Sequence, residues 1–436
     1  MTARGLIVAA PSSGAGKTTV TLGLLAALRR RGIKVRAAKA GPDYIDPAFH
    51  RAACGYPSAN IDTWAMPPEL IHAIVAEVAA DADLLIIESA MGLFDGVRGP
   101  PGRTGAAADL AALLGLPVLL VLDVAGQSVS AAAVAHGFAT FDPDVRVAAV
   151  VLNRVGSDRH RDQASDALRT IAMPVAGALP RDASIVLPER HLGLVQAQEH
   201  PDLTRQLARL ADLVEAHVDL DLILGLAAPI AGNGARAAAL RPPGQCVAVA
   251  EDAAFSFLYE HLAAGWRSLG AEVVPFSPLA DQAPPDRCDA CWMPGGYPEL
   301  HAARLAAATA FCDGLRRFAA TRPVHGECGG YMVLGRAIRD MTGVRHEMVG
   351  LLSHTTSFAA RKRHLGYREA RVLADGPLGR AGTVVRGHEF RYASVSDPGT
   401  DAPLVDLRDG IGNDLGQAGG RRANVTGSFF HAIAAV

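Results

Sequence analysis

Residues 11–19 read Pro-Ser-Ser-Gly-Ala-Gly-Lys-Thr-Thr and combine the residue types that bind a nucleoside triphosphate. Glycines let backbone N–H groups wrap around phosphate oxygens, and the N-terminus of a following helix favours an anion. A lysine adds positive charge near the β- and γ-phosphates, and a threonine hydroxyl can bind Mg²⁺. Pro11 replaces the first glycine of the usual motif, but the loop still stands between an apolar run and a helical pattern. We therefore predict an ATP site formed by Ser13, Gly14, Ala15, Gly16, Lys17, Thr18 and Thr19.

A second segment, in the C-terminal half, has the pattern of a nucleophile. Cys328 stands in Gly-Glu-Cys-Gly-Gly, between a short apolar run and a helical pattern. Glycines on both sides relieve a tight strand-to-helix turn, and a thiol at a helix N-terminus is favoured as the thiolate. The backbone N–H groups of Gly295, Gly296 and Gly329 can stabilise an oxyanion there. The alternative is a buried structural cysteine.

The nucleophile needs a base, and two histidines are candidates. His431 begins the final apolar stretch, and we predict that it is the base. His388, in Gly-His-Glu-Phe, is the alternative. Cys288 and Cys291 form a C-x-x-C pair, but the sequence has no second such pair, so we do not expect metal or redox chemistry from them.

Polar residues gather where the second apolar run of the sequence ends. A lysine there can contact both a γ-phosphate and a carboxylate, and the neighbouring acids can bind a substrate or a metal. The predicted substrate-binding residues are Lys39, Asp43, Tyr44, Asp46 and, farther along, Asp95. An ordinary Gly-Pro-Asp turn is the alternative interpretation.

An acid that closes an apolar strand beside a phosphate loop is a common Mg²⁺ ligand. Glu88 ends the third predicted strand and Asp123 follows the fourth, and we favour Glu88. Together with Thr18 and Asp46 it forms the predicted metal site. Asn153 follows another apolar run, where its amide can bind the edge of adenine or simply cap the strand.

Strand-length apolar runs alternate with helical patterns in the first half of the chain. The runs lie at 5–10, 33–38, 83–88, 117–122, 146–152 and 174–179, and the helical patterns near 17–31, 67–80, 105–115, 127–138 and 159–171. This alternation predicts a parallel sheet with helices on both faces, and such sheets bind ligands beyond the carboxyl ends of their strands. We predict one domain over 1–230, a linker over 231–244 and a second α/β domain over 245–436, in which the alternation runs to the C-terminus.

The composition indicates a large globular protein. A chain of 436 residues with 50% hydrophobic content suits two domains with buried cores. A net charge of −2 gives no electrostatic case for binding nucleic acid or an anionic membrane, and no apolar run approaches the ~20 residues of a membrane span. Six cysteines in so long a chain do not make a disulfide framework, so we expect a reducing cytoplasm. A homodimer is among the assemblies we expect.

Together these motifs resemble the cobyrinic acid a,c-diamide synthases, including the hydrogenobyrinic acid enzymes of the oxygen-dependent vitamin B12 route. The resemblance covers nearly the whole chain and rests on the phosphate loop, the segments around Lys39, Glu88 and Asn153, and the Pro-Gly-Gly-Tyr-Pro-Glu, Gly-Glu-Cys-Gly-Gly and Gly-His-Glu-Phe motifs. The N-terminal part looks like the dethiobiotin-synthetase-like branch of P-loop folds, and the C-terminal part is similar to class I glutamine amidotransferases. Those amidotransferases usually carry an acid two residues after the histidine. Here Ile433 stands there, so the third member of the site stays open.

The resemblance implies a ligase that uses ATP, Mg²⁺ and L-glutamine. Cys328 and His431 would release ammonia from glutamine, and ATP would convert a carboxylate into an acyl phosphate that ammonia turns into an amide. In this family the reaction takes place at the a and c acetate groups of a corrinoid tetrapyrrole, either hydrogenobyrinic or cobyrinic acid. A cobyric acid synthase and a nickel-sirohydrochlorin a,c-diamide synthase are related alternatives. A non-catalytic partition-type ATPase is more remote, because it would carry a lysine where this chain has Ser12 and would lack the cysteine motif.

Overall fold

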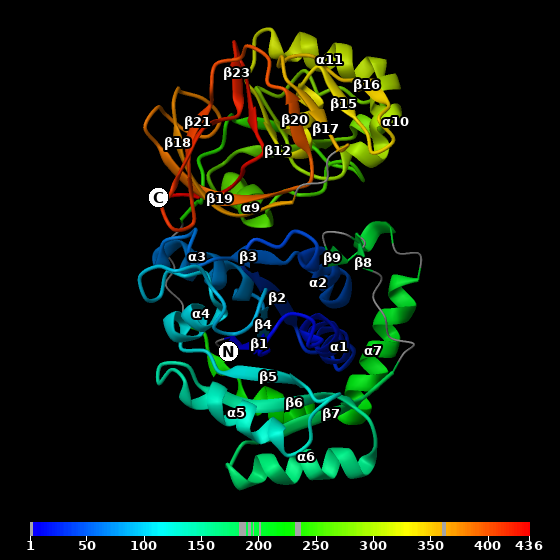
Figure 1. Ribbon diagram of the computed structural model, residues 1–436, viewed down its shortest axis with the longest axis vertical. Coiled ribbons are helices and arrows are strands. Elements are labelled where there is room, and N and C mark those ends of the chain that lie inside the picture. Colours follow the sequence, from blue (N-terminus) through cyan, green and yellow to red (C-terminus); the bar gives the residue numbers. More distant parts are fainter. Residues whose placement is uncertain are drawn as a thin grey trace. The chain divides into compact units, whose positions relative to one another are not determined.

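The computed structural model describes residues 3–182, 189–190, 193–194, 196–199, 202–231, 237–359 and 363–436. The chain divides into two compact units, Met1–Ala235 and Arg236–Val436 (Figure 1). Residues 232–236 of the predicted linker lie outside the described residues. In the part of the chain that the structure describes, no helix is long and apolar enough to cross a membrane.

The N-terminal unit is built on a parallel sheet. Its strands are, in sheet order, β3 (Ala59–Ile61), β2 (Val35–Ala40), β4 (Leu84–Glu88), β1 (Arg4–Ala9), β5 (Val118–Asp123), β6 (Val147–Val155) and β7 (Val175–Pro180). The short β10 (Ala228–Pro229) adds to β1 in the antiparallel direction. β1, β4 and β5 are continuous apolar runs because both faces of a parallel sheet are covered by helices. The predicted parallel α/β fold is confirmed.

Helices connect these strands. They are α1 (Lys17–Arg30), α2 (Asp46–Cys54), α3 (Pro68–Ala79), α4 (Ala107–Leu114), α5 (Ser130–Thr140), α6 (Asp158–Thr170), α7 (Leu203–His217) and α8 (Leu220–Leu226). Short elements follow β7: β8 (Glu189–Arg190), β9 (Gly193–Leu194) and the 3₁₀ turn η1 (Ala197–Glu199). α1 begins directly after the phosphate loop and packs along α7, beside which it lies in Figure 1.

Helix α2 corrects one expectation from the sequence. The sequence indicated no helical pattern at Asp46, just after the second apolar run, but Asp46 is the first residue of α2. The helix starts there because Pro47 occupies its first turn, where a missing N–H costs nothing. The carboxylate of Asp43 accepts hydrogen bonds from the backbone N–H groups of Ile45 and Asp46, both at 2.8 Å, and so satisfies donors that the helix leaves unpaired.

The C-terminal unit has a central sheet and two smaller ones. The central sheet is, in order, β12 (Glu272–Phe276), β11 (Cys246–Ala250), β13 (Ala290–Met293), β14 (Val324–Glu327), β24 (Val425–Ser428) and β23 (Gly420–Arg422). All of its pairs are parallel except β23–β24. The helical elements are α9 (Glu260–Ser268), η2 (Pro278–Ala280), η3 (Pro298–His301), α10 (Ala302–Ala307), α11 (Thr309–Ala319) and α12 (Gly329–Leu334).

The predicted alternation of strands and helices ends at α12. Beyond it, the described residues form strands, turns and loops. One small sheet has the order β16 (Arg345–Glu347), β15 (Ala337–Arg339), β17 (Thr355–Ser357), β20 (Ser394–Asp397). The other is antiparallel, in the order β22 (Asp414–Ala418), β21 (Val405–Asp409), β18 (His364–Val372), β19 (Val384–Arg391), β25 (His431–Ala435). β18 is largely half-exposed and carries charged residues, which is typical of a sheet with one solvated face rather than of a crossover unit.

Candidate active sites

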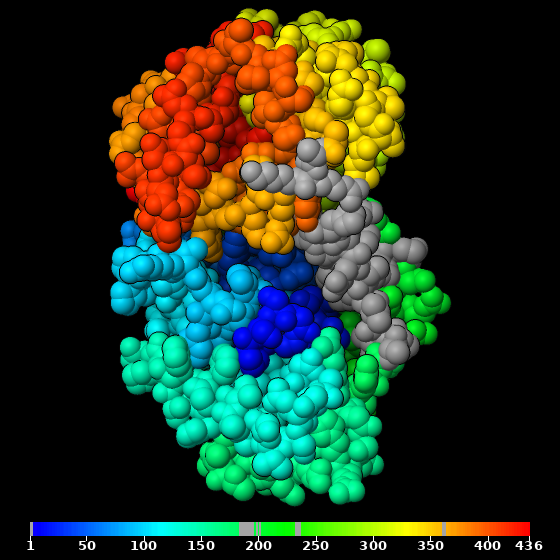
Figure 2. Space-filling model, viewed as in Figure 1, coloured from blue at the N-terminus to red at the C-terminus, as the bar shows by residue number. Residues whose placement is uncertain are grey.

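The phosphate loop, residues 11–16, links β1 to α1 in a conformation that needs its glycines. Gly14 and Gly16 have φ angles of 79° and 91°, which side-chain-bearing residues rarely adopt. A Cβ at position 16 would also stand 2.2 Å from Nδ2 of Asn153. The loop belongs to the N-terminal segment that is blue in Figure 2, part of which is visible at the surface, and Ser13 is exposed. A phosphate can therefore approach the backbone N–H groups from solvent.

Asn153, at the end of β6, is tied to this loop. Its Nδ2 donates a hydrogen bond of 2.9 Å to the carbonyl oxygen of Ala15, and the side chain is buried. In this arrangement the amide fixes the shape of the loop. Binding of adenine by Asn153 stays a prediction.

Lys17 is the buried cation at the start of α1. Its Nζ donates to the carbonyl oxygen of Ser12 at 3.1 Å. Burial and the nearby charge of Lys39 lower its pKa to about 8, while the carboxylates of Glu88, Asp46 and Asp95 act in the opposite direction. An ammonium with a lowered pKa gains from a phosphate, because the added negative charge favours the protonated form.

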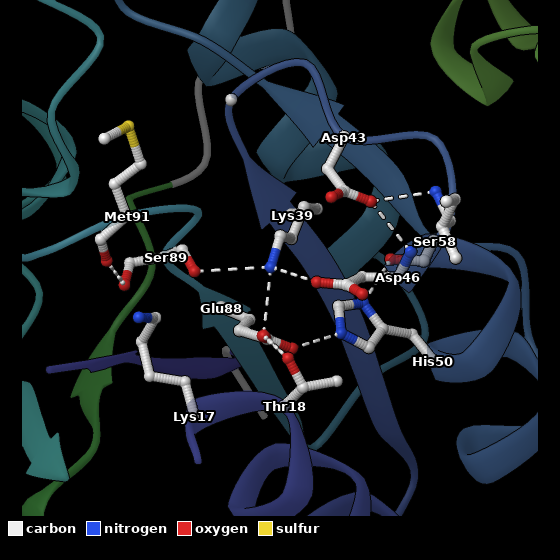
Figure 3. Close-up of polar contacts among 12 residues, drawn as sticks. Lys17, Thr18, Lys39, Asp43, Asp46, His50, Ser58, Glu88, Ser89 and Met91 are labelled. Atoms are coloured by element: carbon white, nitrogen blue, oxygen red, sulfur yellow. Dashed lines mark hydrogen bonds and ion pairs between the residues drawn. The ribbon is translucent and has the colours of Figure 1, made fainter. Parts of the chain in front are cut away.

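Lys39 and Glu88 face each other from neighbouring strands. They are register partners on β2 and β4, and Lys39 Nζ lies 2.9 Å from Glu88 Oε1. The same Nζ lies 2.5 Å from Asp46 Oδ2 and 3.3 Å from the carbonyl oxygen of Ser89 (Figure 3). Burial opposes the charge on Lys39, yet the carboxylates of Asp46 and Glu88 outweigh it and raise its pKa.

Glu88 uses both carboxylate oxygens. Oε1 also accepts a 2.6 Å hydrogen bond from Thr18 Oγ1, and Oε2 lies 2.6 Å from His50 Nε2. Burial would raise the pKa of Glu88, but Lys39 and the hydrogen bond with His50 lower it, so the side chain is an anion. The predicted pair of metal ligands, Thr18 and Glu88, is thus in direct contact.

The other predicted acids have different environments. Burial and the charge of Asp43 raise the pKa of Asp46, with Lys39 acting against them. Asp43 and Tyr44 are half-buried between β2 and α2. Asp95 is exposed, and its Oδ2 accepts a 2.9 Å hydrogen bond from the backbone N–H of Gly92.

Asp123, the alternative to Glu88, forms a different contact. It pairs with Arg154 and accepts a 3.0 Å hydrogen bond from the backbone N–H of Ala125. Thr19, the last residue predicted for the ATP site, is half-buried in the first turn of α1.

Cys328 forms a strained turn between β14 and α12. Its φ and ψ are 45° and −101°, and its Sγ lies 3.8 Å from the carbonyl oxygen of Phe390 on β19. We expected the helix N-terminus to favour the thiolate, but burial, helped by the charge of Glu299, raises the pKa of the thiol to about 12. The difference follows from desolvation, which outweighs the short helix.

Gly295 stands beside both members of the predicted cysteine–histidine pair. A Cβ at Gly295 would lie 2.3 Å from Cε1 and 3.2 Å from Nε2 of His431, and 3.3 Å from Cβ of Cys328. The Nε2 edge of His431 is therefore turned toward the turn that carries the thiol. Burial lowers the pKa of His431 to about 3, so the ring is neutral and can accept a proton. His388 is its register partner on β19, and burial lowers its pKa to about 4.

The predicted oxyanion glycines are neighbours. A Cβ on Gly329 would stand 3.0 Å from the backbone nitrogen of Gly296, and one on Gly296 would clash at 2.1 Å with the carbonyl oxygen of Ala254. Both positions exclude larger residues because backbone approaches closely there. The backbone nitrogen of Gly296 therefore lies close to Gly329, and donation by both N–H groups to one oxygen stays a prediction.

The sequence reasoning did not assign His50 or Glu327, two buried residues at these sites. His50 lies four residues after Asp46 on α2, so the two side chains share one face of the helix, but this spacing does not predict the contact with Glu88. Glu327 is a buried acid immediately before the nucleophile, at a strand position that an apolar residue would ordinarily occupy. An acid at such a strand position is the sequence signal that could have identified Glu327.

The two cysteines of the C-x-x-C pair form no disulfide with each other and belong to no group of metal ligands among the described residues. Cys288 and Cys291 are free thiols, and Cys288 Sγ lies 3.3 Å from Cys246 Sγ. Among the described residues, no three His, Cys, Asp or Glu side chains form a group that could hold a metal ion.

Comparisons with known proteins agree with this two-part architecture. Residues 6–195 match the CobQ/CobB/MinD/ParA nucleotide binding domain, and residues 246–435 match the CobB/CobQ-like glutamine amidotransferase domain. Among curated relatives, the hydrogenobyrinate a,c-diamide synthase of Mesorhizobium japonicum is 63% identical and covers 100% of this chain and 99% of its own. The protein of the same name from Agrobacterium fabrum is 60% identical with the same coverage, and that from Rhodobacter capsulatus is 53% identical, covering 99% of both. At such identity over the full length of each sequence, the chain belongs to the hydrogenobyrinate a,c-diamide synthase family.

Proposed function

We propose that this protein converts two carboxylates of hydrogenobyrinic acid into amides, using ATP and L-glutamine. The observation that supports the proposal is that one chain holds both a phosphate loop, whose following helix contacts the Lys39–Glu88 pair through Thr18, and a cysteine beside a histidine at a strained turn. The names of the relatives supply the substrate and the a and c positions. Cobyrinic acid, which carries cobalt, is the second candidate substrate.

In the glutaminase half, Cys328 Sγ attacks the side-chain amide carbon of glutamine. The thiol proton passes to His431 Nε2 and then to the departing nitrogen, so ammonia leaves and a thioester remains. The N–H groups of Gly296 and Gly329 stabilise the oxyanion of the tetrahedral intermediate. Water hydrolyses the thioester to glutamate, and the thiol is regenerated.

In the synthetase half, a substrate carboxylate attacks the γ-phosphate of ATP. ADP leaves, and the acyl phosphate gives the carbon a good leaving group that a free carboxylate lacks. Ammonia then displaces phosphate to form the amide. Lys17 and Lys39 would balance the negative charge of the transferred group. Repeating the cycle at the second acetate gives the diamide.

Thr18 and Glu88 are suited to hold Mg²⁺ together with the phosphates. Hydroxyl and carboxylate oxygens are its usual donors, and one or two protein ligands suffice when phosphates and water supply the others. The ion would neutralise charge on the β- and γ-phosphates. Asp46, 2.5 Å from Lys39, is the third predicted ligand.

The substrate-binding residues must accept a ring that carries many carboxylates. Asp43, Asp46 and Asp95 would repel it, unless Lys39 or Mg²⁺ offsets their charge. Lys39, with two carboxylates within 2.9 Å, supplies such an offset in the structure. We propose that Tyr44 and Asp95 contact the tetrapyrrole ring as it approaches the phosphates.

The test is to incubate the protein with ATP, Mg²⁺, glutamine and each candidate ring, and to count amidations by mass spectrometry. We expect two amidations of hydrogenobyrinic acid and one ADP for each amide. A product with four amides would indicate a cobyric acid synthase, and reaction only with nickel-sirohydrochlorin would indicate that enzyme instead. ATP hydrolysis without any amide product would refute the ligase assignment.

A further inference from the structure

We propose that Glu327, the residue before the nucleophile, is the acid that positions His431 in the glutaminase site. The inference rests on the proposed function of Cys328 and His431, and it names the third group that the spacing around Ile433 does not supply. The observation behind it is the position of the Glu327 carboxyl group relative to the two nitrogen atoms of the His431 ring.

The two edges of the His431 ring face different groups. The Nε2 and Cε1 edge faces Gly295 and, beside it, Cys328. On the other edge, Nδ1 lies 4.0 Å from Oε2 of Glu327. An acid on one side of a histidine and a nucleophile on the other is the arrangement that sets the tautomer and orientation of a catalytic base. The separation is longer than a hydrogen bond, as such contacts often are before substrate binds.

Glu327 is fixed in this place by the backbone beside the histidine. Its Oε1 accepts a 2.8 Å hydrogen bond from the N–H of Ala432, the residue after His431. The side chains of Glu327 and His431 are each 1% exposed. This hydrogen bond holds the carboxyl group next to the histidine and links the end of β14 to the start of β25.

Burial favours an interaction between the Glu327 carboxyl group and the His431 ring. It raises the pKa of Glu327 to about 8, with the Ala432 N–H and the Trp292 indole acting in the opposite direction. When His431 takes the thiol proton, it becomes a buried cation, and a carboxylate at Nδ1 is the charge that stabilises it. Proton transfer from Cys328 to His431 then leaves the net charge of the site unchanged, because no proton has to enter or leave.

Other titratable groups surround this site and fix what a pH profile reports. His388 on β19 faces His431, and the charges of Glu299 in η3 and of Glu389 and Arg391 on β19 act on Cys328. His388 and His325 are neutral above pH 5, because burial lowers their pKa values to about 4 and about 3. A change near pH 8 that depends on position 327 is therefore assigned to Glu327.

The experiment compares Glu327→Gln with the unmodified protein, using glutamine and ammonium salts as separate nitrogen sources. We expect the glutamine-dependent rate to fall about tenfold to a hundredfold, as for loss of a group that orients a catalytic residue. The ammonia-dependent rate should not change. The rise of the glutamine-dependent rate around pH 8 should disappear, and so should the pH dependence of alkylation of Cys328 by iodoacetamide in that range.

Two further variants control for damage to the fold. His325→Gln alters a buried residue on the same strand whose Nδ1 lies 2.8 Å from Thr426 Oγ1, and it should leave the ratio of the two rates unchanged. Glu327→Asp keeps an ionisable group but shortens its reach, so the glutamine-dependent rate should fall while the pH dependence remains.

Two results are decisive against the proposal, and a third is decisive against the proposed function on which it rests. A Glu327→Gln variant with an unchanged glutamine-dependent rate and pH profile shows that the carboxyl group has no part. Equal loss with both nitrogen sources shows a structural role. If Cys328→Ala itself keeps glutamine-dependent activity, it is the proposed function that fails, and the result is separate from the role of Glu327.

Discussion

His50 Nε2 lies 2.6 Å from Glu88 Oε2, and its Nδ1 lies 3.1 Å from Ser58 Oγ. The ring is completely buried between an acid at the end of β4 and a hydroxyl just before β3. Glu88 therefore contacts Thr18 in the first turn of α1 with one oxygen, and His50 holds the other oxygen. A second contact of this kind fixes the rotamer of a side chain, which matters for Glu88 because we propose that it binds Mg²⁺.

This contact predicts a magnesium effect. His50→Ala should raise the Mg²⁺ concentration needed for half-maximal ammonia-dependent amidation about tenfold to a hundredfold, because Glu88 loses its orienting partner. His50→Gln, which can still donate to Glu88, should restore much of the affinity. Titrating activity with Mg²⁺ at saturating ATP checks both. A parallel loss in the two variants with no change in the Mg²⁺ requirement would point to packing alone.

The two half-reactions should be separable. Cys328→Ala should abolish amidation with glutamine and keep it with ammonium salts, because the acyl phosphate still forms. His431→Ala should show the same defect more mildly. The measurement is the rate of amide formation with each nitrogen source. A glutamine-only defect in His388→Ala but not in His431→Ala would show that we chose the wrong base.

Variants of the synthetase acids should divide into two classes. Lys17→Ala and Glu88→Ala should lose activity with either nitrogen source, since we propose that both side chains act at the phosphates and Mg²⁺. Asp95→Asn should mainly change the ratio of mono- to diamide product, because Asp95 is exposed and its carboxylate is bound to the Gly92 N–H rather than to Lys39. Measuring the ratio of mono- to diamide product by chromatography distinguishes the two classes of variants. Asp123→Asn is the matched control and should retain activity, as its charge pairs with Arg154.

The buried acid at position 327 predicts a pH dependence of stability. Its pKa rises from 4.5 to about 8 on folding, so the folded state binds the proton more tightly than the unfolded state. That contribution is complete below pH 4.5 and is lost as pH rises through about 8. Glu327→Gln has no such group. Between pH 6 and pH 9, the melting temperature of Glu327→Gln should therefore rise relative to that of the unmodified protein. Calorimetry of both proteins measures this difference.

Local motifs account for what the sequence predicts well. The phosphate loop and the turn at Cys328 each occupy a few consecutive residues, and glycine spacing alone indicates their geometry. The parallel sheet follows from continuous apolar runs with helical patterns between them. Lys39 and Glu88 lie at the carboxyl ends of neighbouring strands, which is where parallel sheets bind ligands. Their proximity at one site could therefore also be predicted.

Local sequence patterns did not predict two contacts between segments that are far apart in the sequence. His50 and Glu88 are separated by 38 residues, and no periodic pattern connects them. Glu327 meets His431 only because β14 and β25 are brought together through β24 and the turn that follows it. The state of the Cys328 thiol was mispredicted for a related reason: helix position is local, but desolvation depends on everything that packs around the sulfur.

The backbone at Cys328 carries a further consequence. A residue other than glycine at φ 45° and ψ −101° costs on the order of 1–3 kcal/mol, which the surrounding β14, β24 and α12 must sustain. Glycine would relieve that strain and make this unit harder to unfold, at the expense of its nucleophile. The position is therefore one where selection for chemistry and selection for durability oppose each other. A chain that had lost the need for glutamine would be free to drift toward glycine there.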